Sequence, residues 1–320
     1  MTIYSVAIIG CGGIGYQYNR SHKRQGALSY FRVFHTSPNF RVVGIADVDD
    51  EIRDEIHQQF NVPGYRNVQE LLESRHADVV IVASPEDTHA SILREVLGFH
   101  PKLVFCEKPL ACTLDEVENL VKAYENENIA LAVNYSRRYL RVYEEVRQNI
   151  LSGKLGTIQS VLVYYSRGFL HNASHYLDLF LWWFGEPDEI RVEDRREGLS
   201  KDDPTLSVWL KYAPETEIRL VGLGSSDVLI NEIDIIGSLG RIQIDTMGQL
   251  VVSAIGKHPD YDDFRRYWSK EERCIDLSGA LPNAVNNIYR WLEREVSLKT
   301  PARDSVTLHR FIKRIIEDAP

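Results

Sequence analysis

The chain has 320 residues, which is enough for two domains of ordinary size, and 44% of them are hydrophobic, 26% charged and 10% aromatic, as in a globular protein. Its net charge of −9 argues against nucleic acid as the main partner, because nucleic-acid binding needs a broad cationic surface. A few local arginines would still allow an anionic substrate to bind.

The cysteines Cys11, Cys106, Cys112 and Cys274 show no C-x-x-C spacing, so we expect neither a metal site nor a redox dithiol. The apolar run at residues 3–9 is too short to span a bilayer. It also lacks the basic lead and the cleavage site of a signal peptide. We therefore expect a cytoplasmic protein with no membrane partner.

The first 134 residues alternate short apolar runs with helical patterns. Strands that are apolar throughout are typical of a parallel sheet with helices on both faces, and ligands bind at the carboxyl ends of such strands. Five residues follow the expected strands directly: Gly10, Asp47, Ser84, Glu107 and Asn134. The expected strands are 3–9, 42–46, 79–83, 103–106 and 129–133; the expected helices start near 14 and cover 49–60, a stretch ending at 97, and 113–126, which opens with a Thr113–Glu116 capping box.

After about residue 135 the pattern changes to strands that are segregated from helices. Such segregation predicts an α+β domain with a mostly antiparallel sheet. We therefore predict two domains, residues 1–134 and residues 135–320. In the second, helices are expected at 139–151, 173–184, 283–298 and 305–318, with strands at 157–166 and repeatedly between 189 and 277.

A glycine loop follows the first strand, and Gly10, Gly12 and Gly15 match G-x-G-x-x-G. The first glycine permits a tight turn, the second lets the backbone approach a pyrophosphate, and the third allows close packing of the next helix. Gly13 and Ile14 belong to the same loop. A methyltransferase-type glycine turn is the alternative, but the alternation of strands and helices favours a Rossmann domain that binds a dinucleotide.

Asp47 closes the second strand, where a carboxylate can accept hydrogen bonds from ribose hydroxyls. It follows Gly15 by more than the usual ~20 residues, and we place the excess in a longer first helix and its exit, including residues 20–26. Asp49 and Asp50 follow Asp47. Because carboxylates would repel a 2′-phosphate, NAD is favoured over NADP.

Glu107-Lys108-Pro109 stands at the end of the fourth strand. The proline biases Lys108 toward an extended backbone, and the bond between them can be cis. A lysine here can hydrogen-bond the oxygen of a carbinol or carbonyl and stabilise developing negative charge. The alternative is a surface salt bridge; beside a dinucleotide site we favour a catalytic lysine.

His175 lies near the start of the helix predicted at 173–184, with Asp178 three positions later on the same face and Asn172 as the expected N-cap. A histidine that faces a cleft from a helix start suits proton transfer near neutral pH. The alternative is a histidine satisfied in the domain interface. His171 and Asp178 are weaker candidates for contact with a substrate.

In this order, the motifs resemble those of the glucose–fructose oxidoreductase, inositol dehydrogenase and rhizopine-catabolism (Gfo/Idh/MocA) oxidoreductases. The resemblance covers nearly the whole chain. It implies an N-terminal Rossmann domain and a C-terminal α+β domain whose large, mostly antiparallel open sheet often forms a subunit interface. It rests on Gly10–Gly15, Ala46-Asp47, Ser84-Pro85 with His89, Glu107-Lys108-Pro109, Asn134 with Arg138, and His175 to Asp178.

By matching position, the resemblance implies that Lys108 is the catalytic lysine and His175 the acid/base. It implies that Glu107, Ser84, Pro85 and His89 lie along the cofactor. Asn134 and Arg138 would lie near the substrate. His171 stands where many members carry an aspartate, which argues against an Asp-Lys-His trio of the inositol dehydrogenase type.

We therefore predict hydride transfer between NAD and a hydroxyl or keto carbon of a sugar, cyclitol or nucleotide sugar. A non-catalytic NAD-binding sensor on the same fold is the alternative. The resemblance also implies a homo-oligomer, either a dimer or a tetramer.

Overall fold

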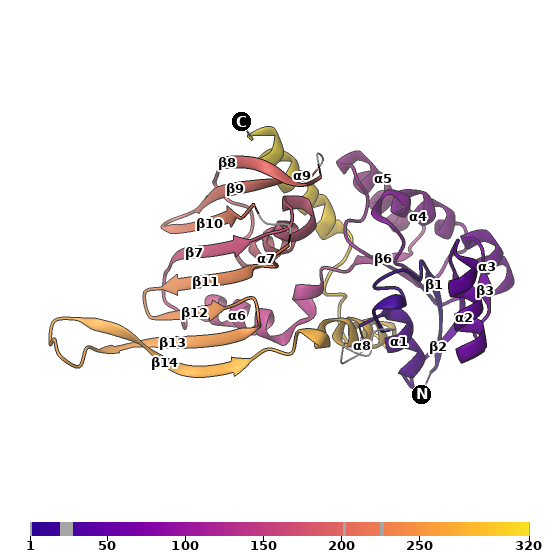
Figure 1. The fold of residues 1–320 in the computed structure, drawn as a ribbon, viewed down its shortest axis with the longest axis horizontal. Helices are drawn as coiled ribbons and strands as arrows, with labels where there is room; N and C mark the ends of the chain where they lie inside the picture. Colours follow the sequence, from indigo (N-terminus) through magenta and orange to yellow (C-terminus); the bar gives the residue numbers. More distant parts are fainter. Residues whose placement is uncertain (1, 20–27, 201–202, 225–226, 320) are drawn as a thin grey trace. The chain divides into compact units, whose positions relative to one another are not determined.

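The computed structural model describes residues 2–19, 28–200, 203–224 and 227–319. The chain forms two compact units (Figure 1): one contains Met1–Tyr139 and Ser278–His309, and the other contains Leu140–Leu277 and Arg310–Pro320. No helix in the described ranges is both long and apolar enough to cross a membrane.

The described part of the first unit is built on a six-stranded parallel sheet with the strand order β3-β2-β1-β4-β5-β6. The order reverses direction between β1 and β4, as in a Rossmann fold, so the predicted fold class of this unit is confirmed. Its strands are β1 (Tyr4–Ile9), β2 (Phe40–Ala46), β3 (Gly64–Tyr65), β4 (Val79–Val82), β5 (Leu103–Cys106) and β6 (Ala130–Val133). Its helices are α1 (Tyr30–Thr36), α2 (Asp50–Phe60), α3 (Val68–Ser74), α4 (His89–Leu97), α5 (Leu114–Asn126) and α8 (Ala280–Leu292).

The strands form because short apolar runs bury every side chain between two helical layers. Every residue of β4 and of β5 is buried. The predicted strands therefore agree with the observed ones to within a few residues. Thr113 caps α5 as predicted, because its Oγ1 accepts a hydrogen bond from the Glu116 N–H at 3.3 Å, and its hydroxyl donates to Glu116 Oε2 at 3.0 Å.

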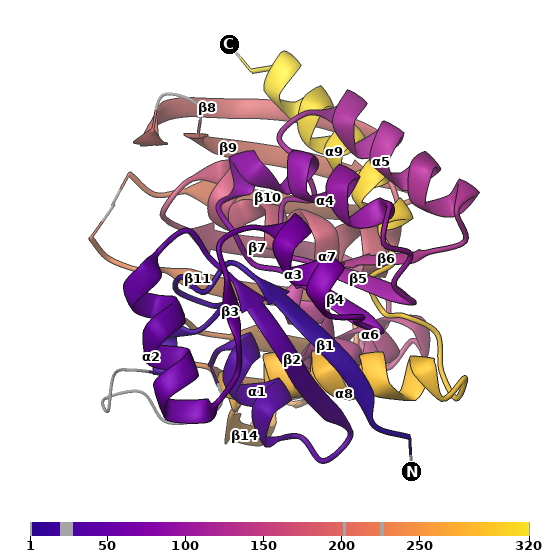
Figure 2. The same ribbon diagram turned by 90° about the vertical axis from the view of Figure 1, so that its right-hand side faces the viewer.

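Helix α8 belongs to the first unit, although the sequence prediction assigned its residues to the second domain. Leu281, Val285 and Ile288 lie on one face of α8 and join the core beneath β1 and β2. Figure 2 shows α8 next to α1 in this unit. The apolar stripe predicts an amphipathic helix but does not indicate which sheet it covers.

The helix predicted near Ile14 was wrong. Residues 17–19 form a short 3₁₀ turn, and among the described residues the first α-helix begins at Tyr30. The N–H groups of Tyr30 and Phe31 nevertheless donate to the carbonyls of Ile14 and Gly15 at 2.9 and 3.0 Å. The start of α1 therefore bonds to the carbonyls of the glycine loop as the next turn of a helix would. The predicted helix exit at residues 20–26 lies outside the described residues.

The second unit contains an eight-stranded sheet with the order β14-β13-β12-β11-β7-β10-β9-β8 (Figure 1). Among these strands β7 and β10 pair in parallel and the other neighbours pair antiparallel, so the predicted open, mostly antiparallel sheet is confirmed. The strands are β7 (Ile158–Tyr165), β8 (Glu189–Ser200), β9 (Asp203–Tyr212), β10 (Thr216–Gly222), β11 (Asn231–Gly237), β12 (Gly240–Ile244), β13 (Gln249–Lys257) and β14 (Arg265–Cys274).

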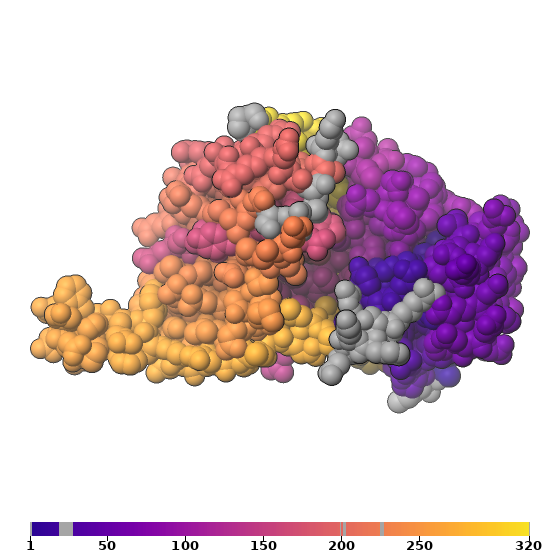
Figure 3. Space-filling view, in the orientation of Figure 1, coloured from indigo at the N-terminus to yellow at the C-terminus, as the bar shows by residue number. Residues whose placement is uncertain are grey.

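One face of this sheet is covered and the other is open. Along β7, Val161, Val163 and Tyr165 are buried, whereas the alternate side chain of Tyr164 is 38% exposed. Figure 1 shows α6 (Arg141–Leu151) and α7 (Ser174–Phe184) behind the strands, and α9 (Arg303–Glu317) completes the chain. The far end of the β13–β14 hairpin extends beyond the rest of the sheet (Figure 3).

Candidate active site

The carboxyl ends of the parallel strands gather the side chains that the sequence analysis selected in the first unit. Gly10 follows β1, Asp47 follows β2, and Ser84 comes shortly after β4. Glu107 and Asn134 follow β5 and β6. Because all these strands are parallel, the residues share one edge of the sheet, which is where open α/β sheets bind ligands.

The glycine loop is shaped as a cradle. Gly10 has a φ of +86°, and a Cβ there would lie 2.5 Å from the Ser84 nitrogen. A Cβ at Gly15 would lie 2.1 Å from the carbonyl oxygen of Gly10. By contrast, a Cβ at Gly12 would meet no described atom within 4 Å. A Cβ at Gly13 would lie 2.8 Å from the Tyr18 ring. The loop therefore packs tightly at its two ends and is open at Gly12, as the approach of a pyrophosphate requires.

Asp47 is attached to this loop. Its Oδ2 accepts a hydrogen bond from the Cys11 N–H at 2.6 Å, and its Oδ1 accepts one from the Asp49 N–H at 2.9 Å. Each carboxylate oxygen retains a lone pair that could accept a ribose hydroxyl. Burial raises the pKa of the Cys11 thiol, and the charge of Asp47 adds to the rise, so Cys11 stays a neutral thiol.

Arg53 is a neighbour of Asp47 that the sequence analysis missed. Its Nη1 donates to the Asp47 carbonyl oxygen at 2.6 Å, and its Nη2 contacts Asp50 Oδ1. The helical spacing of Asp50 and Arg53 is the signal that could have indicated this ion pair. A cation beside the second strand bears directly on the choice between NAD and NADP.

Glu107 is held by two buried side chains. Tyr30 Oη donates to Glu107 Oε1 at 2.6 Å, and Asn134 Nδ2 donates to the same oxygen at 2.7 Å. Burial and the charge of Glu107 raise the pKa of Tyr30, so its hydroxyl remains a donor. No motif marks Tyr30 in the sequence, because its role depends on a contact with a residue 77 positions away. Asn134 Oδ1 is buried and has no hydrogen-bond partner among the described residues, so it could accept a donor from a bound molecule.

His89 joins two of the loops at this edge. Its Nδ1 lies 2.7 Å from the Pro109 carbonyl oxygen, and its Nε2 lies 3.0 Å from the Ser84 carbonyl oxygen. The ring is only 1% exposed. His89 therefore supports the loop that carries Lys108, and its place along the cofactor stays a prediction. The Lys108–Pro109 bond is cis, which the sequence allowed.

The side chain of Arg138, which the sequence analysis expects near the substrate, forms an ion pair with Asp304. Its Nη1 donates to Asp304 Oδ2 at 2.7 Å and lies 3.4 Å from the Lys299 carbonyl oxygen. Only 5% of the Arg138 side chain is exposed, against 33% for Asp304. The guanidinium thus fastens residues 299–304 to the end of the Rossmann domain, and its contact with a substrate stays a prediction.

Replacing Arg138 with methionine is expected to lower the free energy of unfolding by about 3 kcal/mol, because the carboxylate of Asp304 would lose its partly buried partner. Urea denaturation followed by circular dichroism measures this change. Arg141→Met is the matched control: Arg141 is 87% exposed and pairs with Glu145, so its loss should cost under about 0.5 kcal/mol. Equal effects of the two substitutions would contradict the structural role of Arg138.

His175 lies in the second unit, on α7. Residues 169–173 form a π-helical turn that continues into α7. The carboxylate of Asp203 accepts hydrogen bonds from the N–H groups of Leu170 at 2.6 Å and His171 at 3.0 Å. Asp203 therefore supports the segment that carries His175, and no sequence motif indicates this role.

The prediction that Asn172 caps the helix was wrong. Asn172 lies within the π-helical turn that precedes α7. Its Nδ2 donates a hydrogen bond to the Ser166 carbonyl oxygen at 2.8 Å. His171 is exposed on the second unit, whereas Asp178 is 1% exposed. The burial of Asp178 favours a supporting role over contact with a substrate.

Residues 4–135 match the family model described as "Oxidoreductase family, NAD-binding Rossmann fold" (GFO_IDH_MocA). Glucose-6-phosphate 3-dehydrogenase of Bacillus subtilis is 30% identical over 162 residues, which are 51% of this chain and 42% of that protein. Inositol 2-dehydrogenase of Rubrobacter xylanophilus is 29% identical over 48% of this chain and 41% of its own length. The chain thus spans about two fifths of the length of these two relatives. Myo-inositol 2-dehydrogenase of Thermotoga maritima is 25% identical over 76% of this chain and 79% of that protein.

The WlbA dehydrogenase of Bordetella pertussis, solved with NADH and UDP-GlcNAcA, shares the fold with a TM-score of 0.80 at 18% identity. That match covers 99% of this chain and 96% of the solved one. An oxidoreductase of Agrobacterium radiobacter, solved with NAD+, L-tartaric acid and magnesium, has a TM-score of 0.76 at 16% identity, over 99% and 96% of the two chains. The family model thus matches the part of the chain that contains the glycine cradle and Asp47, and the fold of 99% of the chain resembles that of these two solved structures.

Proposed function

We propose that this protein transfers a hydride between a nicotinamide dinucleotide and a hydroxyl or keto carbon of a sugar, cyclitol or nucleotide sugar. The main support is the arrangement at one edge of the first unit's sheet. There the open glycine cradle follows β1, Asp47 follows β2, and Lys108 comes just after β5. An anion cradle, a ribose acceptor and an ammonium group are what such a reaction requires of the chain.

In this proposal the loop from Gly10 to Gly15 holds the pyrophosphate, and Asp47 accepts the ribose hydroxyls. Ser84, Pro85 and Glu107 line the remaining length of the site. When bound there, the nicotinamide would supply the acceptor or donor of the hydride. The buried acceptor Asn134 Oδ1 is suitably placed among these residues to receive an amide or hydroxyl hydrogen.

Lys108 and His175 act on the oxygen of the reacting carbon. The Lys108 ammonium group hydrogen-bonds this oxygen and stabilises its negative charge as the hydroxyl proton leaves. The His175 imidazole takes that proton during oxidation and returns it during reduction of the ketone. His89 and Asp203 support the two segments that carry these groups. The candidates for direct contact with the substrate are Asn134, Arg138, His171 and Asp178, and of these His171 is exposed.

We propose NAD as the preferred cofactor. Asp49 and Asp50 follow Asp47, the proposed ribose acceptor, along the chain, and carboxylates beside the ribose would repel a 2′-phosphate. Arg53 is the cation nearest to them in sequence, and its contacts with Asp50 and the Asp47 carbonyl engage its guanidinium. An arginine that is already paired offers less to a phosphate than a solvated one.

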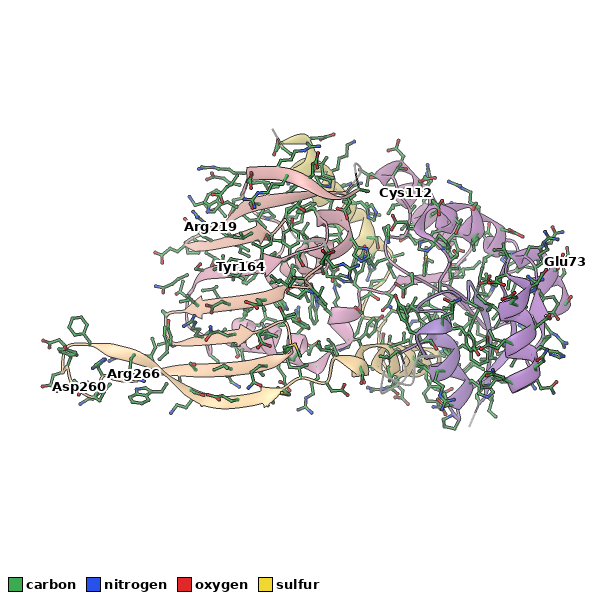
Figure 4. The ribbon with its side chains drawn as sticks, viewed as in Figure 1. Glu73, Cys112, Tyr164, Arg219, Asp260 and Arg266 are labelled. Carbon is green, nitrogen blue, oxygen red and sulfur yellow. The ribbon has the colours of Figure 1, made fainter. Side chains whose placement is uncertain are left out.

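We further propose a homo-oligomer, a dimer or tetramer, that associates through the open face of the eight-stranded sheet. Tyr164 and Arg219 mark this face in Figure 4. A shallow groove of about 290 Å³ lies on it, lined by Leu162, Tyr164 and Val251 among others. We also propose that the protein is cytoplasmic and that its partner is a small molecule, not nucleic acid or a membrane.

The test is the change in nicotinamide absorbance when purified protein is mixed with NAD or NADH and a panel of substrates. The panel should contain cyclitols, sugar phosphates, free sugars, sugar acids and nucleotide sugars, since the relatives' names span these classes. A signal with one class identifies the substrate class, and repeating it with NADP tests the cofactor preference. If the protein binds NAD but is silent across the panel in both directions, the proposal fails in favour of a non-catalytic NAD sensor.

A further inference from the structure

A second pocket lies in the first unit, at the opposite ends of the strands from the glycine cradle. It is lined by Tyr4, the first residue of β1, by Lys102, which precedes β5, and by Ala130, the first residue of β6. Its volume is about 890 Å³, within the range of small-molecule sites. Because the strands are parallel, this pocket is separated from the cradle by the length of the sheet.

The body of the pocket is apolar and partly aromatic. Tyr124 on α5, Trp291 at the end of α8, and Leu298 in the following loop contribute to its wall. Trp291 and Leu298 are only partly buried, although both pack against the unit's hydrophobic core. These side chains would cover a ring or a short alkyl chain.

The charged groups that line the pocket are predominantly cationic. They are Lys102, Arg294 and Arg303, opposed by a single carboxylate, Glu125. Lys102 is already paired with Asp78, at 2.9 Å. Neither Arg294 nor Arg303 has a carboxylate within ion-pair distance among the residues that the structure describes. The pocket therefore offers two guanidinium groups to an anion, in a protein whose net charge is −9.

The backbone at Arg294 provides an independent observation. Arg294 follows the C-cap residue of α8 with a φ of +61°, in the left-handed region. Glycine or asparagine is the usual residue there, because a Cβ is strained in this conformation. The chain thus carries a long cationic side chain at a position where a smaller residue would be more stable, which points to a function for the guanidinium.

We propose that this pocket binds a small organic anion, in which a phosphate or carboxylate group is attached to an apolar ring or chain. The guanidinium groups of Arg294 and Arg303 hold the anionic group, and Trp291, Tyr124 and Leu298 cover the apolar part. The start of α9 adds to the attraction, because Pro301, Ala302 and Arg303 form part of the wall and the N-terminus of a long helix favours negative charge. This site does not depend on the proposed dehydrogenase reaction.

The test uses the full chain saturated with NAD and the fluorescent probe 1-anilinonaphthalene-8-sulfonate, an aromatic ring system with one anionic group. Arg294→Asn is expected to weaken binding of the probe about tenfold, the effect of one lost charged hydrogen bond. The same substitution should leave the melting temperature unchanged or raised, since asparagine accepts the left-handed backbone. Arg303→Gln should weaken binding similarly.

Lys122→Gln is the matched control, because Lys122 is an exposed cation on α5 that is not part of the pocket lining. It should leave probe affinity within about twofold of the unaltered chain. Equal affinities for all three variants and the unaltered chain would overturn the proposal.

Competition identifies the anion. Displacement of the probe by phenyl phosphate and not by octanoate would assign a phosphate ester, and the reverse would assign a carboxylate. Displacement by both would indicate that the site recognises charge and apolar body alone. Displacement by neither compound would overturn the proposal.

Discussion

Replacing Lys108 with alanine is expected to lower kcat about a hundred- to a thousand-fold, which is the usual effect of removing one donor that stabilises charge in a transition state. The dissociation constant for NAD should stay within about twofold of the unaltered value, because the cradle is formed by other residues. Steady-state kinetics with the substrate found in the panel, together with calorimetric titration of NAD, measure the two quantities separately.

Lys154→Ala is the control for loss of a lysine, since Lys154 is exposed and lies in the second unit. It should change neither kcat nor NAD binding. Normal turnover in the Lys108 variant would refute its catalytic role. Loss of NAD binding together with turnover would instead show that Lys108 belongs to the cofactor site.

Alanine at Gly15 is expected to destabilise the fold, whereas alanine at Gly12 is expected to leave the fold unchanged and to weaken cofactor binding. A methyl group at Gly15 would overlap the Gly10 carbonyl oxygen. Because this oxygen belongs to the backbone, it cannot easily move away to relieve the clash. We expect Gly15→Ala to lower the free energy of unfolding by about 3 kcal/mol. Gly12→Ala should leave the melting temperature unchanged but weaken NAD binding at least about tenfold, because its methyl group projects into the open part of the cradle.

Gly224 offers a matched control in the second unit. A Cβ there, as at Gly12, would meet no described atom within 4 Å. Gly224→Ala should therefore alter neither the melting temperature nor NAD affinity. If Gly12→Ala bound NAD as tightly as the unaltered chain, the pyrophosphate would not lie in this loop.

Much of the fold could be predicted because it depends on local patterns. Short runs that are apolar throughout, such as Val79–Val82, predict a parallel sheet, and Thr113 with Glu116 predicts a helix start. The short elements α3 and β3 were missed, because seven and two residues carry little periodicity. The attachment of α8 to the first unit was missed as well, since an amphipathic stripe does not identify its partner.

The candidate site shows the same division. Residues at strand ends could be grouped from the sequence, because topology alone brings Gly10, Asp47 and Glu107 to one edge. The contacts that hold these residues in place could not be predicted from the sequence. Tyr30 reaches Glu107 across 77 positions, and Arg138 reaches Asp304 across 166. Whether an arginine is exposed or buried in an ion pair depends on such contacts, so the burial of Arg138 could not be predicted from the sequence. The catalytic roles of Lys108 and His175 remain predictions.

The hydrogen bonds between the start of α1 and the glycine loop explain why Asp47 follows Gly15 by more residues than usual. The bonds from Tyr30 to Ile14 and from Phe31 to Gly15 would be ordinary i to i−4 bonds if twelve intervening residues were absent. Asp47 follows Gly15 by 32 positions, and setting aside those twelve leaves 20, close to the ~20 usual for this fingerprint. The motif is thus conventional when counted along hydrogen bonds instead of along the chain. A sequence search that fixes the glycine-to-acid interval would overlook dinucleotide-binding domains with an excursion at this point.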